Sequence, residues 1–109
     1  MKIIQLPRRG GKTYQIATLL KANPTHAAVV FSHVAREGVL HEHDPDGKLK
    51  LAVRIFSVQD VLNHKLLSHR FDVIHVDNLD MVLRALLGGD VGLVTTTEGA
   101  SNDEVHYHL

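Results

Sequence analysis

Two kinds of apolar pattern alternate along the chain. Short, mainly apolar runs recur, among them AAVVFS and FDVIHV, and the unbroken run AAVVFS is typical of a strand that a parallel sheet buries on both faces. Between them, apolar residues recur at three- and four-residue spacing, which is the pattern of amphipathic helices. The runs predict strands at residues 2–6, 27–32, 51–56, 71–76 and 91–97. The spaced segments predict helices at residues 12–22, 33–40, 58–69 and from 79 to just before Gly88.

Local signals mark where these elements begin and end. Ser57 stands three residues before Asp60, as in a capping box, and the pairs Asn23-Pro24 and Gly88-Gly89 end helical patterns. The stretch HEHDPDGK, residues 41–48, is the least apolar part of the chain and contains the turn sequence DPDG. We therefore expect an exposed loop over residues 41–48.

The alternation of strands and helices predicts the fold class. Strands that alternate with helices pair in parallel through right-handed crossovers, so we expect an α/β fold, a three-layer α/β/α sandwich with a five-stranded parallel sheet. With 109 residues the chain has room for one hydrophobic core, so residues 1–109 are expected to form a single domain. The core covers residues 1–97, and the polar tail 98–109 contains an alternation typical of a short edge strand, at Val105, Tyr107 and Leu109.

Composition excludes several classes of function. Twelve basic and twelve acidic residues give a formal net charge of zero, so nucleic-acid binding would have to rest on a local patch. The chain has no cysteine, which excludes a thiolate zinc site and a cysteine nucleophile. No apolar run approaches the roughly 20 residues that span a bilayer, and the N-terminus does not resemble a signal peptide. We expect a soluble, cytoplasmic protein without a membrane partner.

The segment LPRRGGKT, residues 6–13, follows a predicted strand and precedes a predicted helix. It resembles a Walker A loop, in which the backbone amides of a glycine-rich turn at a helix N-terminus hold a phosphate chain. Lys12 would reach the β- and γ-phosphates, and the Thr13 hydroxyl would ligate Mg²⁺. Leu6 departs from the motif, whose first position is usually glycine, and a simple turn before a helix is the alternative for this segment alone. The predicted phosphate-binding residues are Pro7, Arg8, Arg9, Gly10, Gly11, Lys12, Thr13 and Tyr14.

The segment FDVIHVDN, residues 71–78, is an apolar strand pattern that ends in an acid, and it resembles a Walker B motif. Asp77 would lie at the carboxyl end of a central strand and hold the metal opposite Thr13. Hydrolytic proteins with this motif usually have Glu at the next position, where this chain has Asn78. An amide cannot accept a proton, which leaves slow hydrolysis, substitution by another acid such as Asp80, or binding without turnover. For Asp77 alone, capping of the following helix is the simpler alternative.

Together the two motifs resemble the core of RecA-like, additional-strand P-loop NTPases, among them the ATPase lobe of phage terminase large subunits and superfamily helicases. The resemblance covers about residues 1–97 and implies the strand order 5-1-4-3-2, with ATP or GTP and Mg²⁺ bound at the carboxyl ends of the strands. Thr95, Thr96 and Thr97 resemble a polar γ-phosphate sensor, although threonine also suits a strand for its own reasons. The resemblance further implies a phage-encoded protein of the host cytoplasm, linked to DNA transactions, with an oligomer or partner subunit that supplies an arginine finger.

The predicted catalytic residues are Lys12, Asp77, Asn78 and Arg9, and the predicted metal ligands are Thr13 and Asp77. Arg8 and Arg9 have two interpretations: direct stabilisation of charge on the γ-phosphate, or a general attraction of anions. The leading function is nucleoside triphosphate binding with slow hydrolysis. The alternative is a non-catalytic interaction or regulatory module that keeps the fold. A small-molecule kinase is disfavoured because no arginine-rich lid segment is evident.

Nine histidines are scattered along the chain. His41 and His43 with Asp44, and His106 with His108, have spacings that could chelate a metal, but further ligands are lacking and we expect no structural zinc. His75 lies inside an apolar strand, which favours a neutral, hydrogen-bonded imidazole in the core.

Overall fold

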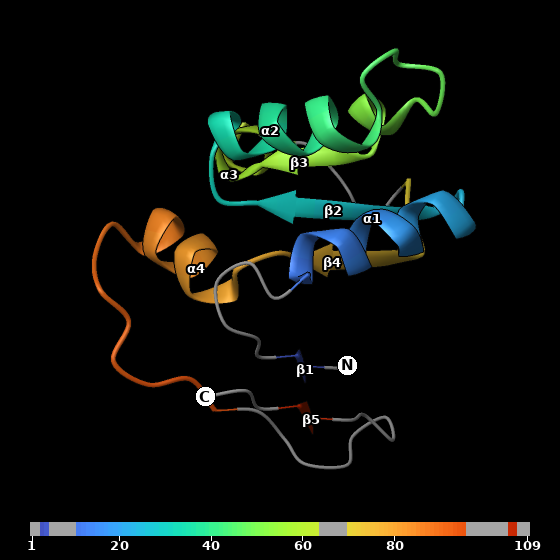
Figure 1. Cartoon of the computed structure of the whole chain (residues 1–109). Coiled ribbons are helices and arrows are strands. Elements are labelled where there is room, and N and C mark those ends of the chain that lie inside the picture. Colours follow the sequence, from blue (N-terminus) through green and yellow to red (C-terminus); the bar gives the residue numbers. More distant parts are fainter. Residues whose placement is uncertain (1–2, 5–10, 64–69, 96–104, 107–109) are drawn as a thin grey trace.

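The computed structural model describes residues 3–4, 11–63, 70–95 and 105–106. Four α-helices are found in these ranges (Figure 1): α1 (Lys12–Ala22), α2 (His33–His43), α3 (Val58–Leu62) and α4 (Leu79–Leu87). The strands are β1 (Ile3–Ile4), β2 (His26–Val30), β3 (Ile55–Ser57), β4 (Val73–Val76) and β5 (Val105–His106), and a short 3₁₀-helix, η1 (Leu51–Val53), precedes β3.

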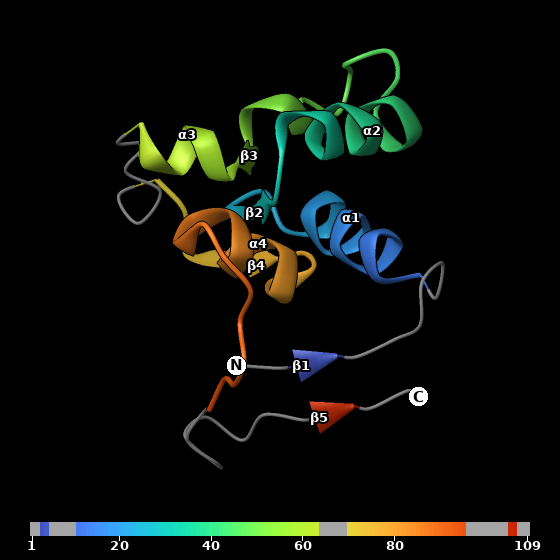
Figure 2. The same ribbon diagram turned by 90° about the vertical axis from the view of Figure 1, so that its left-hand side faces the viewer.

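Parallel pairing joins the strands into two sheets. The larger sheet has the order β3-β2-β4, with Ala28 opposite both Ile55 and His75. The strands β1 and β5 form a separate two-stranded parallel sheet, which lies on the β4 side of the larger one in both views (Figures 1 and 2). The expected parallel α/β character is therefore present, in two sheets instead of one.

The predicted five-stranded sheet with order 5-1-4-3-2 is wrong. Strand β2 lies in the centre of the larger sheet, where the prediction placed the strand that ends before Asp77. Residues 91–95 form no strand, and β1 pairs with β5, a segment of the predicted tail. The burial of the strands agrees with this order, because the residues from Ala27 to Val30 are buried whereas Val73, Ile74 and Val76 are each about 40% exposed.

Helices cover both faces of the larger sheet, because side chains alternate between the faces along each strand. On one face, Ala28, Val30 and Ile55 pack against α1 and α2, where they contact Leu20 and Val39. On the other face, Ala27, Val29 and Phe56 form a cluster with Val58 of α3 and Val82 of α4. Two hydrophobic clusters thus hold the sheet between two pairs of helices, as Figure 2 shows.

Several local predictions agree with the structure. Helix α1 has the expected bounds, and the capping box is formed, since Ser57 and Asp60 each accept a hydrogen bond from the other's backbone amide. Gly88 ends α4 with a left-handed φ of 74°. The described part of the helix predicted over 58–69 ends at Leu62, and residues 64–69 lie outside the described ranges.

The predicted loop over residues 41–48 begins later than expected, because α2 continues to His43. Asp44 then organises the following turn: its Oδ1 accepts the Leu49 amide at 3.0 Å and its Oδ2 accepts the Leu51 amide at 3.1 Å. The carboxylate is buried, so it belongs to the core of the turn and not to an exposed metal-binding loop. No helix in the described part of the chain is long and apolar enough to cross a membrane.

Candidate functional site

The two sequence motifs meet through a hydrogen bond between Thr13 and Asp77. Thr13, in the first turn of α1, donates its hydroxyl to Asp77 Oδ2 at 2.8 Å. Asp77 directly follows β4, and its backbone amide donates to the Val29 carbonyl at 3.0 Å, which continues the pairing of β4 with β2. Residues 64 positions apart are thus held together where the strand ends and the helix begins.

The Asp77 carboxylate is buried, with 6% of the residue exposed. Its second oxygen, Oδ1, has no hydrogen-bond partner among the described residues. A buried carboxylate oxygen without a donor is costly, because the oxygen loses its water and gains no replacement. An oxygen in this state is therefore a candidate ligand for a cation or for an ordered water.

The helix end beside Asp77 is suited to an anion. Gly11 is the N-cap of α1 and has a φ of 89°, a left-handed conformation that glycine adopts without strain. It offers no side chain to cap the first-turn amides, and no acidic residue lies in that turn. Neither Gly11 nor an acidic side chain of the first turn therefore caps the amides at the start of α1, which carry a partial positive charge.

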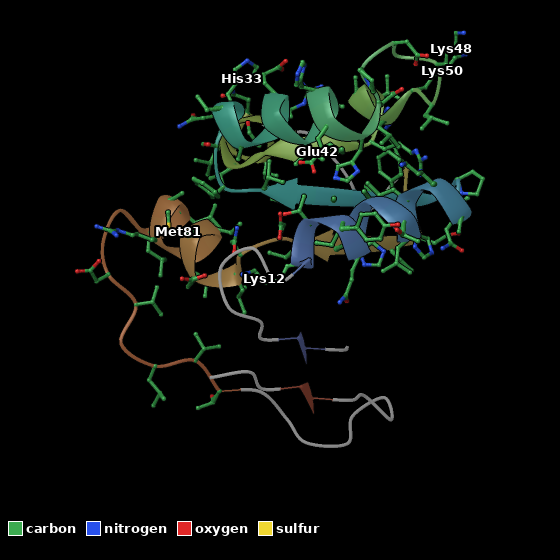
Figure 3. The ribbon with its side chains drawn as sticks, in the orientation of Figure 1. Lys12, His33, Glu42, Lys48, Lys50 and Met81 are labelled. Atoms are coloured by element: carbon green, nitrogen blue, oxygen red, sulfur yellow. The ribbon has the colours of Figure 1, made fainter. Side chains whose placement is uncertain are left out.

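A pocket of about 700 Å³ opens at this helix end. Its lining includes Asn78, Asp80 and Met81, at the start of α4, and Glu42 and His43, in the last turn of α2. Figure 3 shows Lys12 with Met81 to its left and Glu42 above it. The remaining lining residues are Gly11, Lys12, Thr13, Tyr14 and Phe31. The volume is in the range of small-molecule sites in proteins.

The backbone conformation at position 78 favours asparagine. It is the N-cap of α4 and adopts a left-handed conformation with φ 56° and ψ 68°. Asn tolerates this region better than most residues, whereas Glu would be strained there. The same residue that replaces the expected glutamate is thus also the one that fits the turn between β4 and α4. The cap that was the simpler alternative for Asp77 is not formed, since the N-cap is Asn78 and the Asp77 carboxylate accepts from Thr13.

A histidine pair links the first residue of β2, His26, with His75 in the second half of β4. His26 Nδ1 and His75 Nε2 lie 3.0 Å apart and share a hydrogen bond. Burial and the neighbouring His26 both lower the pKa of His75 below its ordinary value of 6.5. The hydrogen bond and the lowered pKa agree with the neutral, hydrogen-bonded imidazole expected for His75, but the expected core position is wrong, because His75 is half-buried on an edge strand of the larger sheet.

No group of three or more potential His, Cys, Asp or Glu metal ligands is found within residues 3–4, 11–63, 70–95 and 105–106. His41 and His43 lie on α2, and Asp44 beside them uses both oxygens in the turn. Both Asp44 oxygens are therefore occupied by backbone amides, so Asp44 does not add a ligand to the histidines at 41 and 43.

The structure brings together Gly11, Lys12, Thr13 and Tyr14 with Asn78, and Asp77 lies behind Thr13. Pro7, Arg8, Arg9 and Gly10, and also Thr96 and Thr97, lie outside the described residues. Thr95 is exposed and belongs to no strand, so the expected sensor position at the end of a fifth strand is not formed there.

Sequence analysis missed four lining residues, Phe31, Glu42, His43 and Met81. Glu42 and His43 were assigned to an exposed loop, and the signal that could have found them is the apolar Val39 and Leu40 continuing the helical spacing of α2. Comparison of the chain with protein-family models, with curated proteins and with solved structures found no match in any of the three.

Proposed function

We propose that the pocket at the start of α1 binds a nucleoside triphosphate together with Mg²⁺. The observation that carries this proposal is the hydrogen bond of 2.8 Å between Thr13 and Asp77, with the second Asp77 oxygen buried and given no partner by the described part of the chain. The two residues are the ones that the Walker A and Walker B resemblances single out for the metal. Thr13 and Asp77 lie 64 positions apart in the sequence, so the fold of the chain, and not their closeness in sequence, brings them into contact.

The phosphate chain would lie against the first turn of α1. There Gly11 brings no side chain to cap the helix amides, and Lys12 adds a positive charge. Glu42 and Asp80 also line the pocket, so a polyphosphate entering without a cation would meet two carboxylates of like charge. We therefore expect nucleotide binding to depend on a divalent cation.

The residues present fit Mg²⁺. This ion takes hard oxygen ligands and is usually held by one or two protein groups, with phosphates and waters completing its shell. Thr13 Oγ1 and Asp77 Oδ1 would hold it, directly or through water, and the lack of a cluster of three ligands in the described residues is compatible with this mode. When bound, the ion would neutralise charge on the phosphates and so stabilise charge that develops during transfer.

Hydrolysis would need a group that orients the attacking water. Asn78 cannot accept a proton, and Asp80 is the acid nearest to it in sequence that also lines the pocket. We propose slow turnover with Asp80 in this role and an arginine supplied by Arg9 or by a partner subunit. The alternative, a binding module without turnover, is favoured by one observation, the left-handed backbone that disfavours glutamate at position 78.

Titration calorimetry with Mg²⁺-ATP and Mg²⁺-GTP tests the proposal. We expect wild type to bind at least one of them and Lys12→Ala to weaken that binding roughly tenfold or more, since a charge-assisted contact to phosphate is lost. Lys21→Ala is the matched control, because Lys21 lies in the last turn of the same helix. Omission of Mg²⁺ should weaken binding as well. Wild type that binds neither nucleotide, or equal effects of the two lysine variants, would overturn the proposal.

Phosphate release under the same conditions separates the two functions. Release by wild type that is lost in Asp80→Asn favours an enzyme, whereas binding without release favours the non-catalytic module. Asp90→Asn is the control for Asp80, because Asp90 is an acid outside the pocket that contacts Arg84.

A further inference from the structure

One part of the pocket lining has no role in the proposed binding of phosphate and metal. It is formed by Tyr14 of α1 and by Glu42 and His43 in the last turn of α2. The rings of Tyr14 and His43 lie 6.1 Å apart and are tilted by 58°, so the two helices meet there through an aromatic contact. The His43 side chain is 8% exposed, whereas Tyr14 is 67% exposed.

The orientation of a bound nucleotide follows from the positions of Thr13 and Asp77. In a glycine-rich phosphate loop, the lysine reaches the β- and γ-phosphates and the threonine ligates their metal. The γ-phosphate would therefore point towards Asp77 and the α4 side of the pocket. The ribose and base continue from the opposite end of the phosphate chain, which directs them past Tyr14 to the last turn of α2.

An exposed tyrosine ring at this place offers a surface for a base. Aromatic side chains stack on nucleobases without regard to their identity, because every base has a π-face. Tyr14 therefore explains affinity for a base and does not select one. Selection of one base requires a polar group that forms hydrogen bonds with the edge of the base.

Glu42 is that polar group. Its carboxylate lines the pocket, and it lies 4.0 Å from His43 Nε2. An ionised carboxylate only accepts hydrogen bonds, and beside a triphosphate it is repelled unless it faces a donor. Guanine presents two adjacent donors, N1–H and the 2-amino group, which match the two carboxylate oxygens. Adenine presents its 6-amino group beside the acceptor N1, which would oppose the second oxygen.

We propose that the part of the pocket formed by Tyr14, Glu42 and His43 is a base site that selects guanine. In it, Glu42 accepts hydrogen bonds from N1–H and the 2-amino group while Tyr14 packs on the ring. This inference rests on the proposed nucleotide site and resolves which nucleotide it takes. It makes the protein a binder of GTP and GDP in preference to the adenine nucleotides.

Calorimetric titration of the full chain with the Mg²⁺ complexes of GTP, ITP and ATP tests the base site. Wild type should bind GTP roughly tenfold or more tightly than ATP, since two charge-assisted hydrogen bonds distinguish them. ITP, which lacks the 2-amino group, should fall between them. Glu42→Gln should weaken GTP binding and not ATP binding, because the Gln amide can both donate and accept and so matches the edge of adenine.

Glu37→Gln is the matched control, because Glu37 is an exposed acid on the same helix, outside the pocket. It should leave the preference for GTP unchanged. Glu42→Ala is a second variant that removes the carboxylate without adding a donor, and it too should abolish the preference. Circular dichroism checks that each variant is folded, as expected for a side chain that is 76% exposed.

The titrations distinguish failure of the guanine site from failure of the proposed nucleotide site. Equal binding of GTP and ATP by wild type, or equal weakening of both by Glu42→Gln, would overturn the guanine site while leaving the nucleotide site intact. Binding of none of the three nucleotides would overturn the proposed function, and the guanine site with it.

Discussion

Asp44 and Asp77 are buried to the same extent, each 6% exposed, yet their surroundings differ. Both oxygens of Asp44 accept backbone amides, those of Leu49 and Leu51, so its hydrogen bonding is complete within the turn. Asp77 accepts one hydrogen bond from Thr13, and its other oxygen has no partner among the described residues. A satisfied carboxylate stabilises the fold, whereas an oxygen without a donor among the described residues, beside the pocket-lining Thr13, is the one that the proposed metal site would use.

The same isosteric substitution at both positions tests this comparison most directly, and it has the largest expected effect. Asp44→Asn replaces an acceptor oxygen with an NH₂ group that faces a backbone amide, and we expect the free energy of unfolding to fall by about 2 kcal/mol. Asp77→Asn keeps an acceptor for Thr13 and exchanges a buried, charged oxygen that has no donor among the described residues for a neutral amide group. We expect it to change stability by less than about 1 kcal/mol in either direction.

Urea denaturation followed by circular dichroism measures both variants. A loss at Asp77 as large as that at Asp44 would mean that both carboxylates serve the fold. In calorimetry, Asp77→Asn should also remove the dependence of nucleotide binding on Mg²⁺, whereas Asp44→Asn should retain it. The two assays together separate a structural acid from a ligand-binding acid.

A second prediction concerns Asn78, the residue that turns the chain from Asp77 into α4. Its φ of 56° favours Gly or Asn, so Asn78→Gly should leave stability within about 0.5 kcal/mol. Asn78→Ala and Asn78→Glu should each lower stability by about 1 kcal/mol, because a β-carbon is strained in this region. Thermal unfolding compares the three variants. Equal stability of the Gly and Ala variants would show that the left-handed turn does not constrain the residue.

Asn78→Glu also bears on turnover. If hydrolysis is limited by the missing acid, this variant should release phosphate faster than wild type despite its lower stability. An unchanged rate would indicate that an arginine from elsewhere is limiting instead.

The parts of the fold that sequence predicted are those governed by neighbouring residues. The capping box of Ser57 and Asp60 and the stop at Gly88 depend on side chains within one turn of the backbone they contact. The strand order was wrong because pairing depends on residues far apart in sequence. One signal was present: the run AAVVFS is apolar throughout, whereas FDVIHV contains Asp72 and His75, which suits an edge more than a centre.

The motif residues of the candidate site were predictable from the sequence, whereas the residues that line the pocket from α2 were not. Thr13 and Asp77 were named from their motifs, and the expected sheet order was not needed to bring them together, since α1 packs beside β2 and β4 pairs with β2. Helix α2 continues to His43, beyond the end at residue 40 that Gly38 suggested. Its last turn therefore lies against Tyr14, and Glu42 and His43 line the pocket. Packing between helices decided these positions, and the sequence pattern alone does not encode it.

The smallest expected effect concerns a third group in the same region, the pair of His26 and His75. Both lie on the face of the sheet that α1 and α2 cover, and β4 continues from His75 directly to Asp77. The two rings share one hydrogen bond, which needs at least one neutral imidazole. Arg54 is the charged group beside them, and it donates to the His26 carbonyl at 3.2 Å. A proton added to His75 is disfavoured first by burial, which lowers the pKa of the ring, and then by the neighbouring His26.

Because the pKa of His75 is lower in the folded chain than its ordinary value of 6.5, the unfolded chain binds more protons below that pH. The stability that the neutral pair contributes is thus present above about pH 6.5 and is lost as the pH falls through that value towards the folded pKa.

We expect the difference in unfolding free energy between wild type and His75→Gln to shrink from pH 7.5 to pH 5.5. The effect is small because the ring is only partly withdrawn from water. Denaturation curves at both values measure it, with His33→Gln, a substitution on an exposed turn of α2, as the control. A difference that stays constant with pH would show that the pair contributes packing alone and does not couple protonation to the strand that carries Asp77.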